Sequence, residues 1–369
     1  MQHRSLFERV KLGAIELSHR VAMAPLTRLR SDLNGDIATD LMAQYYGQRA
    51  SAGGLIISEA TTVARNGRGY LGAPGIYSDT QVAGWRGVTE AVHAKGGRIF
   101  LQLWHVGRVS HVDMTGGEAP VAPTAMPFEG AAFTANGWVA PSPARALETE
   151  EIAGIVEAFR TAAQRAKDAG FDGVEIHGAN GYLIDQFLQD GSNQRTDRYG
   201  GSVENRARLL LEVTQAVVSV WGGDRVGVRL SPSGKFLSMS DSNPEATFDH
   251  VAQALNPFGL AYLHVVEPRV NGSELVAEGL APVASARLRK IFKGALIAAG
   301  GFEAEDAAAA IARGEVDLVA FGRHFIANPD LPERFRNGWP LNAYDRSTFY
   351  GGDHAGYVDY PFHAEGRQS

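Results

Sequence analysis

Cysteine is absent from the 369 residues of this sequence. Its absence excludes thiol nucleophiles, disulfides, zinc–thiolate sites and cysteine-ligated iron–sulfur clusters together. Any redox chemistry therefore needs an organic cofactor or a metal held by other side chains. We predict that no metal is bound.

Long runs of one charge and long apolar runs are also lacking. The 35 basic and 41 acidic side chains leave a formal net charge of -6 and are well mixed, which offers no electrostatic footprint for nucleic acid or an anionic membrane. No apolar run approaches membrane-spanning length, and Met1–Lys11 lacks the apolar core of a secretory signal. We therefore expect a cytoplasmic protein, as a monomer or small homo-oligomer, that binds neither nucleic acid nor membranes.

Short apolar segments alternate with segments of helical period along most of the chain. This alternation is typical of repeated βα units around a parallel sheet. Helices are predicted over Glu148–Ala169 and Ala304–Ala312, and each is closed by a nearby glycine. Eight strands are predicted: Arg20–Pro25, Gly54–Glu59, Arg98–Trp104, Gly173–His177, Arg225–Leu230, Leu260–Val266, Ala295–Ala299 and Asp317–Phe321.

Eight such units favour an α/β fold with a single (β/α)8 TIM barrel spanning residues 1–369. A doubly wound sheet is the alternative, but no Gly-x-Gly-x-x-Gly fingerprint opens the first unit. Each strand except the third is expected to lead promptly into a helix. After the third strand, Gly107–Leu147 predicts an insertion, since a stretch of this length is typical of a lid or subdomain over a site. Residues after Asn337 are predicted to fold back over the barrel.

The fourth unit is the richest in polar side chains at a strand end, where barrels place their chemistry. Its segment GVEIHGANGY puts His177, Asn180 and Tyr182 within six positions. A neutral imidazole and an amide can both donate to one carbonyl or nitro oxygen, and a phenol with an unperturbed pKa of ~10 suits a general acid. Helix capping or buried backbone partners are the alternative, but the three residues together favour a functional role.

Arg229 stands near the end of an otherwise apolar fifth strand. A buried guanidinium needs a negative partner. That partner is either structural, with Glu59 and Glu175 at similar strand positions, or an electron-rich cofactor atom. The residues alone do not choose between these interpretations.

The seventh and eighth strands end in Gly300-Gly301 and Gly322-Arg323. Glycine lets backbone amides approach phosphate oxygens, arginine pairs with them in two-pronged geometry, and barrels commonly bind phosphate at these two strand ends. Together the two ends predict a phosphorylated ligand.

Gln102 shares a face of the third strand with Phe100 and Trp104. An inward amide needs a donor and an acceptor at once, which a flavin pyrimidine edge or a base supplies; a bond to neighbouring backbone is the alternative. The first strand ends in Ala24-Pro25-Leu26-Thr27, which offers a hydroxyl beside a rigid proline.

Four longer segments carry a resemblance. The sequence resembles the old yellow enzyme family, in its N-ethylmaleimide-reductase-like branch, over essentially the whole chain. The segments are Val21–Arg28 (VAMAPLTR), Leu103–Arg108 (LWHVGR), His177–Leu188 (HGANGYLIDQFL) and Asn193–Arg206 (NQRTDRYGGSVENR).

The resemblance implies non-covalent FMN, reduced by NADPH or NADH and reoxidised by an alkene that a carbonyl or nitro group activates. It implies that Thr27 contacts flavin O4, that Arg229 faces N1 and O2, and that His177 and Asn180 bind the activating oxygen. Flavin N5 then delivers hydride to the β-carbon, and Tyr182 protonates the α-carbon. The other implied cofactor contacts are Ala24, Pro25, Leu26, Ala60, Gln102 and, for the phosphate, Gly300, Gly301, Gly322 and Arg323; Tyr70, Trp104 and Tyr350 wall the substrate pocket.

Two other classes of function compete with this interpretation. A phosphate-binding barrel lyase or isomerase would use Tyr182 or His177 as acid or base without a redox cofactor. A protein that only binds or stores flavin would not need a tyrosine beyond the histidine–asparagine pair. The family also has members with His in place of Asn180, and a related branch has Cys in place of Thr27. We expect these differences to shift substrate preference and flavin potential.

Overall fold

Eight parallel strands form a closed ring in the computed structural model, which describes residues 3–271, 274–275 and 285–364. The strands pair in the order β11-β12-β13-β16-β17-β3-β4-β6, and pairing of β11 with β6 closes the ring. All eight predicted strands are found, with small differences at their ends. They are β3 (Val21–Met23), β4 (Leu55–Ile57), β6 (Arg98–Trp104), β11 (Gly173–Gly178), β12 (Val226–Leu230), β13 (Tyr262–Val266), β16 (Leu296–Ala299) and β17 (Leu318–Phe321).

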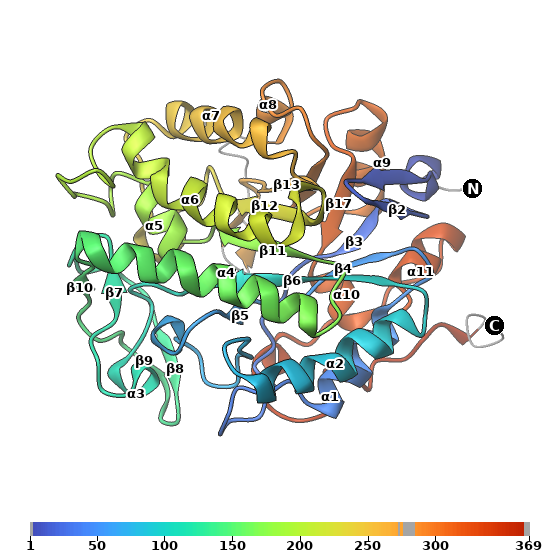
Figure 1. Ribbon diagram of the computed structural model, residues 1–369. Helices are drawn as coiled ribbons and strands as arrows, with labels where there is room; N and C mark the ends of the chain where they lie inside the picture. Colours follow the sequence, from blue (N-terminus) through green and yellow to red (C-terminus); the bar gives the residue numbers. More distant parts are fainter. Residues whose placement is uncertain (1–2, 272–273, 276–284, 365–369) are drawn as a thin grey trace.

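Helices surround these strands (Figure 1). The predicted helix from Glu148 begins with a 3-10 turn, and the α-helix then buries Ile155, Phe159 and Ala163 at helical spacing. This pattern packs one apolar stripe against the sheet. The helices are α1 (Asp40–Arg49), α2 (Asp79–His93), α4 (Ile152–Asp168), α5 (Leu183–Leu188), α6 (Val203–Trp221), α7 (Pro244–Leu255), α8 (Ser285–Leu288), α9 (Ala304–Ala312), α10 (Arg323–Ala327) and α11 (Leu331–Asn337).

Long loops follow several strands at their carboxyl ends. The expectation that a helix comes promptly is therefore wrong for β3, β4 and β12, because residues 24–39 precede α1, residues 58–78 precede α2 and residues 231–243 precede α7. Between β13 and α8 lie β14 (Val270–Asn271), β15 (Glu274–Leu275) and residues outside the described part of the chain. A barrel builds its site from the loops at this end, so their length supplies the walls of a cavity.

The inside of the barrel divides into an apolar and a polar half. The apolar half contains side chains of β3, β4, β16 and β17 such as Leu55, Ile297 and Leu318, joined by Phe100 of β6 and Tyr262 of β13. A hairpin of β1 (Val10–Leu12) and β2 (Ile15–Leu17) joins the same cluster and closes the amino-terminal end. Its turn residue Gly13 has φ +56°, and an added Cβ would lie 2.0 Å from the carbonyl oxygen of Asp224. The polar half, from β6, β11, β12 and β13, holds Gln102, Glu175, His177, Arg229 and His264.

The predicted insertion follows the third barrel strand, β6. It contains α3 (Val112–Thr115), the parallel pair β7 (Val121–Ala122) and β10 (Arg145–Ala146), and a hairpin of β8 (Ala132–Thr134) and β9 (Gly137–Val139); β5 (Thr61–Thr62) pairs with β6 beside it. The tail after Asn337 returns to the barrel, where Arg28 holds the carbonyl oxygen of Phe349. The last residues of the tail, 365–369, lie outside the described part.

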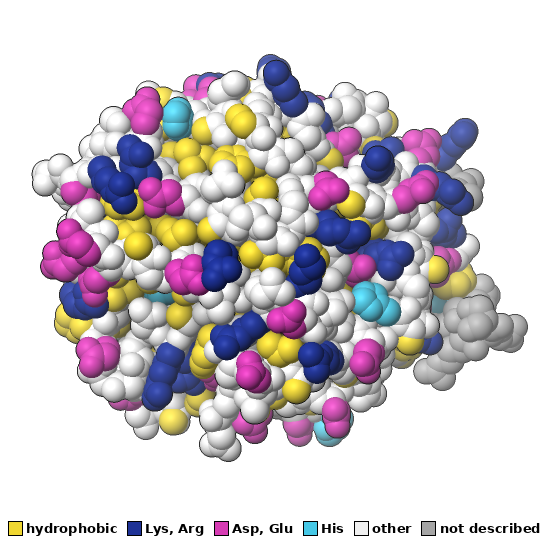
Figure 2. Space-filling view, viewed as in Figure 1, with side chains coloured by type: hydrophobic (Ala, Val, Ile, Leu, Met, Phe, Trp, Pro, Cys, Tyr) yellow, Lys and Arg dark blue, Asp and Glu magenta, His cyan; other side chains and the backbone are white. Residues whose placement is uncertain are grey.

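Charged side chains of both signs are interspersed on the face shown in Figure 2, which carries no large patch of one sign outside the grey residues. Within the described ranges, none of the helices combines the length and apolar character that a membrane span requires.

Candidate active site

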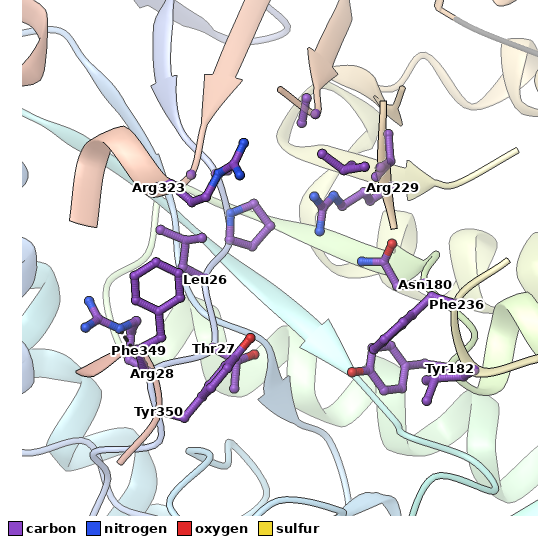
Figure 3. A pocket seen from close by; sticks show the side chains of 18 of the residues that line it. Leu26, Thr27, Arg28, Asn180, Tyr182, Arg229, Phe236, Arg323, Phe349 and Tyr350 are labelled. Atoms are coloured by element: carbon purple, nitrogen blue, oxygen red, sulfur yellow. Dashed lines mark hydrogen bonds between the residues drawn. The ribbon is translucent and has the colours of Figure 1, made fainter. Parts of the chain in front are cut away.

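A cavity of about 740 Å³ opens at the carboxyl ends of the barrel strands. This volume is in the range of a site for a cofactor or a drug-sized ligand. The structure brings thirteen of the predicted site residues to its wall from six of the eight βα units and the tail: Ala24, Pro25, Leu26, Thr27, Tyr70, Asn180, Tyr182, Arg229, Gly300, Gly301, Gly322, Arg323 and Tyr350. In Figure 3, Asn180 and Tyr182 lie on one side, and Thr27 and Tyr350 lie opposite.

Four predicted site residues lie behind this wall instead: Ala60, Gln102, Trp104 and His177. Trp104 stacks against His177 with ring centroids 6.4 Å apart, and its edge-on contact with Tyr182 is 4.9 Å. Ala60 packs in the same cluster as Trp104 and Tyr70. These aromatic rings therefore belong to the packed wall and do not stand free in the cavity.

His177 is held as a neutral donor. Its Nδ1 accepts a hydrogen bond from the backbone N–H of Ala179 at 3.3 Å. Burial, with further help from the positive charge of Arg229, lowers the pKa of His177 well below its ordinary value. A neutral ring with a lone pair on Nδ1 carries its proton on Nε2. His177 therefore offers one N–H to a ligand and no positive charge.

Asn180 sits in a left-handed turn with φ +57°, a conformation that asparagine tolerates better than most residues. Its backbone N–H donates to Ser231 Oγ at 2.7 Å, and the next amide, of Gly181, donates to Asp185 Oδ2 at 2.8 Å. A side chain at Gly181 would come within 3.0 Å of Leu237. This bracing fixes the turn so that the Asn180 amide points into the cavity (Figure 3).

Tyr182 keeps its proton. Burial raises its pKa to about 12, and its hydroxyl donates to the hydroxyl of Tyr70 at 3.4 Å. The rings of His177 and Tyr182 meet edge to face at 5.2 Å. The site therefore combines two neutral hydrogen-bond donors with a protonated phenol.

Arg229 faces the cavity without a hydrogen-bonded partner for its buried Nε among the described residues. Of its two predicted structural partners, Glu59 accepts instead from the backbone of Arg28 and from Tyr46. Glu175 attracts Arg229 electrostatically, but both of its oxygens are engaged by other side chains. Since an unpartnered guanidinium N–H beside a cavity suits an electron-rich ligand, this arrangement favours the cofactor interpretation.

The ends of β16 and β17 form a glycine-rich recess beside Arg323. Gly300 and Gly301 have φ of +113° and +69°, which exposes their backbone in a conformation that side chains rarely adopt. Arg323 forms no ion pair within the described part of the chain, and its guanidinium lies 5.9 Å over the ring of Tyr344. Backbone amides and an unpaired arginine suit a phosphate group.

Several wall residues were not predicted from the sequence. The loop after β12 contributes Lys235, Phe236 and Leu237, and the insertion contributes Trp138. Leu237 and Ser238 both have positive φ near +60°, and buried Arg108 donates to the Leu237 carbonyl oxygen at 3.0 Å. This loop is distinguished only by its left-handed backbone conformation. The sequence pattern therefore gave no indication that it lines the cavity. The aromatic content of the insertion was a signal for Trp138.

Comparison with known proteins gives a consistent result. The chain matches the NADH:flavin oxidoreductase / NADH oxidase family over residues 5–342. It is 49% identical over 358 residues to 12-oxophytodienoate reductase 1 of Oryza sativa subsp. japonica, covering 95% of this chain and 91% of the rice protein. A structure of morphinone reductase in complex with tetrahydroNAD has a TM-score of 0.91, 52% identity and 99% coverage of both chains. The structure of an old yellow enzyme homologue from Zymomonas mobilis has a TM-score of 0.92 and 45% identity, covering 96% of this chain and 99% of that one. These similarities confirm the predicted barrel and the predicted family.

Proposed function

The chain belongs to the NADH:flavin oxidoreductase / NADH oxidase family, and we propose that it is an ene-reductase that uses FMN and NADPH or NADH to reduce alkenes activated by a carbonyl or nitro group. As a member of the old yellow enzyme family, it is a flavin-dependent NAD(P)H oxidoreductase with small-molecule substrates. One observation carries the proposal. The neutral donors His177 and Asn180 and the protonated Tyr182 converge beside a cavity where Arg229 Nε has no hydrogen-bond partner among the described residues.

The cavity wall fits FMN at three points. Arg229 suits the electron-rich N1–O2 edge, and the recess of Gly300, Gly301, Gly322 and Arg323 suits the phosphate. Thr27, Gln102 and the backbone near Ala60 would hold the O4 and pyrimidine edges, beside Ala24, Pro25 and Leu26. When bound, FMN supplies the hydride that reaches the β-carbon of the alkene.

His177 and Asn180 would bind the activating oxygen of the substrate. Charge develops on this oxygen as the β-carbon is reduced, and two preorganised N–H donors stabilise it. A neutral histidine does this without a counter-anion, so the site accepts uncharged enones and nitroalkenes. We assign the walls of the substrate pocket to Tyr70 and Tyr350, with Trp104 stacked behind Tyr70.

Tyr182 would transfer its Oη proton to the α-carbon. Its pKa of about 12 means that the proton stays in place until a strongly basic carbon forms beside it. The Tyr70 hydroxyl, 3.4 Å away, is positioned to stabilise the phenolate that results. The proton and the hydride would thus enter at neighbouring carbons and saturate the double bond.

The insertion Gly107–Leu147 would act as a lid. Trp138, on its hairpin, is 53% exposed and meets Tyr350 of the tail at 5.9 Å and Tyr70 at 5.9 Å. These rings stand at the cavity wall, where they would exclude water from the bound alkene.

The decisive experiment follows the colour of the purified protein. We expect a yellow protein with one FMN per chain, bleached by NADPH or NADH without oxygen and recoloured by 2-cyclohexenone as cyclohexanone forms. Colourless protein that takes up no FMN would instead favour the barrel lyase or isomerase. Recolouring by oxygen alone, with no saturated ketone formed, would contradict the alkene-reductase assignment.

A further inference from the structure

A carboxylate lies inside the barrel beneath the proposed flavin site. Glu175 is fully buried, and its Oε1 accepts from Gln102 Nε2 at 2.7 Å while its Oε2 meets His264 Nδ1 at 2.8 Å. His264 is fully buried and Gln102 nearly so. Burying a carboxylate in a barrel interior is costly, and an apolar cluster fills the other half of the same interior. A carboxylate at this position therefore needs a functional explanation.

Glu175 determines which way the Gln102 amide faces. An ionised carboxylate only accepts hydrogen bonds, so the amide must turn its NH₂ group toward Glu175. Although burial raises the pKa of Glu175, electrostatic attraction by His264 and Arg229 and the hydrogen bonds from His264 and Gln102 hold that pKa below its ordinary value. The Gln102 Oε1 is then the atom left for a ligand, and it requires an N–H donor such as the imide of a flavin pyrimidine.

Glu175 also lies one layer below Arg229. The strand register pairs His177 with Arg229, and Glu175 with Gly227, two residues nearer the amino-terminal end of the barrel. His264 pairs with Arg229 from the other side. The carboxylate thus sits under the guanidinium and attracts it without a direct hydrogen bond. It offsets part of the positive charge that Arg229 presents to the cavity.

We propose that Glu175 is a positioning residue with two effects. It orients the Gln102 amide toward the flavin pyrimidine, and it offsets part of the positive charge of Arg229. The second effect lowers the flavin midpoint potential. This inference rests on the proposed FMN site. Because reduction adds negative charge to the flavin, a nearby carboxylate disfavours it, and removing that carboxylate should favour it.

Two variants separate the two effects. Glu175→Gln keeps the shape but removes the charge, so the FMN midpoint potential should shift to a more positive value. Glu175→Asp keeps the charge but withdraws it from Gln102, so FMN should bind about tenfold more weakly, with a smaller change in potential. Potentials are measured by anaerobic reduction against a reference dye, and affinities by quenching of FMN fluorescence with the apoprotein.

Controls distinguish a local from a general effect. Glu157→Gln removes one carboxylate from an exposed ion pair on α4 and should leave both readouts at wild-type values. If Glu175 acts on affinity through Gln102, the weakening caused by Glu175→Asp should largely vanish in a Gln102→Leu background. Wild-type potential and FMN affinity in both folded Glu175 variants would overturn this proposal alone. A wild-type protein that binds no FMN would overturn the proposed function as well.

Discussion

Arg28 donates from Nε to the carbonyl oxygen of Phe349 at 2.8 Å, across 321 positions of sequence. Its Nη2 also reaches the carbonyl oxygens of Thr348 and Gly356, and the Gly351 amide donates back to the Arg28 carbonyl oxygen. One buried arginine thus ties the loop after the first barrel strand to the tail that carries Tyr350. The loop that carries Thr27 and the tail that carries Tyr350 lie on the same side of the cavity, and the position of both depends on this connection.

Arg28→Leu should release the tail. It leaves the buried carbonyl oxygens of Phe349 and Gly356 without their donor, while the Thr348 carbonyl oxygen keeps the bond from Arg30. We therefore expect the free energy of unfolding to fall by about 2–4 kcal/mol. Trypsin should also cleave the tail faster, which limited proteolysis followed by mass spectrometry would detect. Arg313→Gln, which removes an exposed ion pair with Glu315, should change stability by less than about 1 kcal/mol. Equal stability of the two variants would contradict the role of Arg28.

Tyr182→Phe should separate the two half-reactions. The variant lacks the Oη proton, so reduction of 2-cyclohexenone should slow by about 10²-fold or more. Flavin reduction by NADPH in the same variant, measured by anaerobic stopped flow, serves as the internal control and should stay near the wild-type rate. Unchanged enone turnover would remove Tyr182 as the proton donor.

His177→Ala should weaken binding of the activating oxygen. Loss of the Nε2–H donor should raise the dissociation constant of phenol, read from its charge-transfer band with the flavin, by about tenfold. The constant for 2-cyclohexenone should rise with it. Asn180→Ala should act in the same direction. If titrations of both variants match the wild type, the polarising pair is wrongly assigned.

His177 and Tyr182 should add no pH dependence to alkene reduction across the neutral range. Burial lowers the pKa of His177 well below its ordinary value and raises that of Tyr182 to about 12, so neither group changes protonation between about pH 6 and about pH 9. His177 stays neutral above its lowered pKa, and Tyr182 stays protonated below its raised pKa. Stopped-flow rates of flavin reoxidation by 2-cyclohexenone test this. A titration near pH 6.5 that His177→Ala abolishes would contradict it.

Arg323→Gln should discriminate between two flavins. If Arg323 pairs with the phosphate, FMN should bind roughly 10–100-fold more weakly, while the affinity for riboflavin, which has no phosphate, should not change. Fluorescence titrations of the apoprotein with each flavin measure both constants. Equal weakening for FMN and riboflavin would place Arg323 elsewhere in the site.

Much of the site was predictable because its residues stand at the ends of strands. Apolar segments of this length marked all eight strands, and glycine or polar residues at their ends pointed to Asn180, Arg229 and Gly300. Adjacent parallel strands bring such positions to one end of a barrel whatever the detailed packing.

Other features depended on contacts that no sequence pattern contains. The Glu175 partners Gln102 and His264 come from different strands, and their pairing follows from ring closure and register rather than from spacing. The expectation of a prompt helix was wrong after β3, β4 and β12. The residues of these long loops line or support a cavity and follow no regular apolar period, so the sequence pattern does not mark them.

The sequence by itself determined the barrel, its family and the presence of His177, Asn180 and Tyr182 in one glycine-rich turn. Local periodicity and short segments carry that information directly. Only the tertiary structure decided that His177 is a neutral Nε2–H donor, that Tyr182 keeps its proton and that Arg229 Nε has no partner within the part of the chain that the structure describes. Protonation and hydrogen bonding depend on burial and on neighbours distant in sequence, and folding alone brings those together.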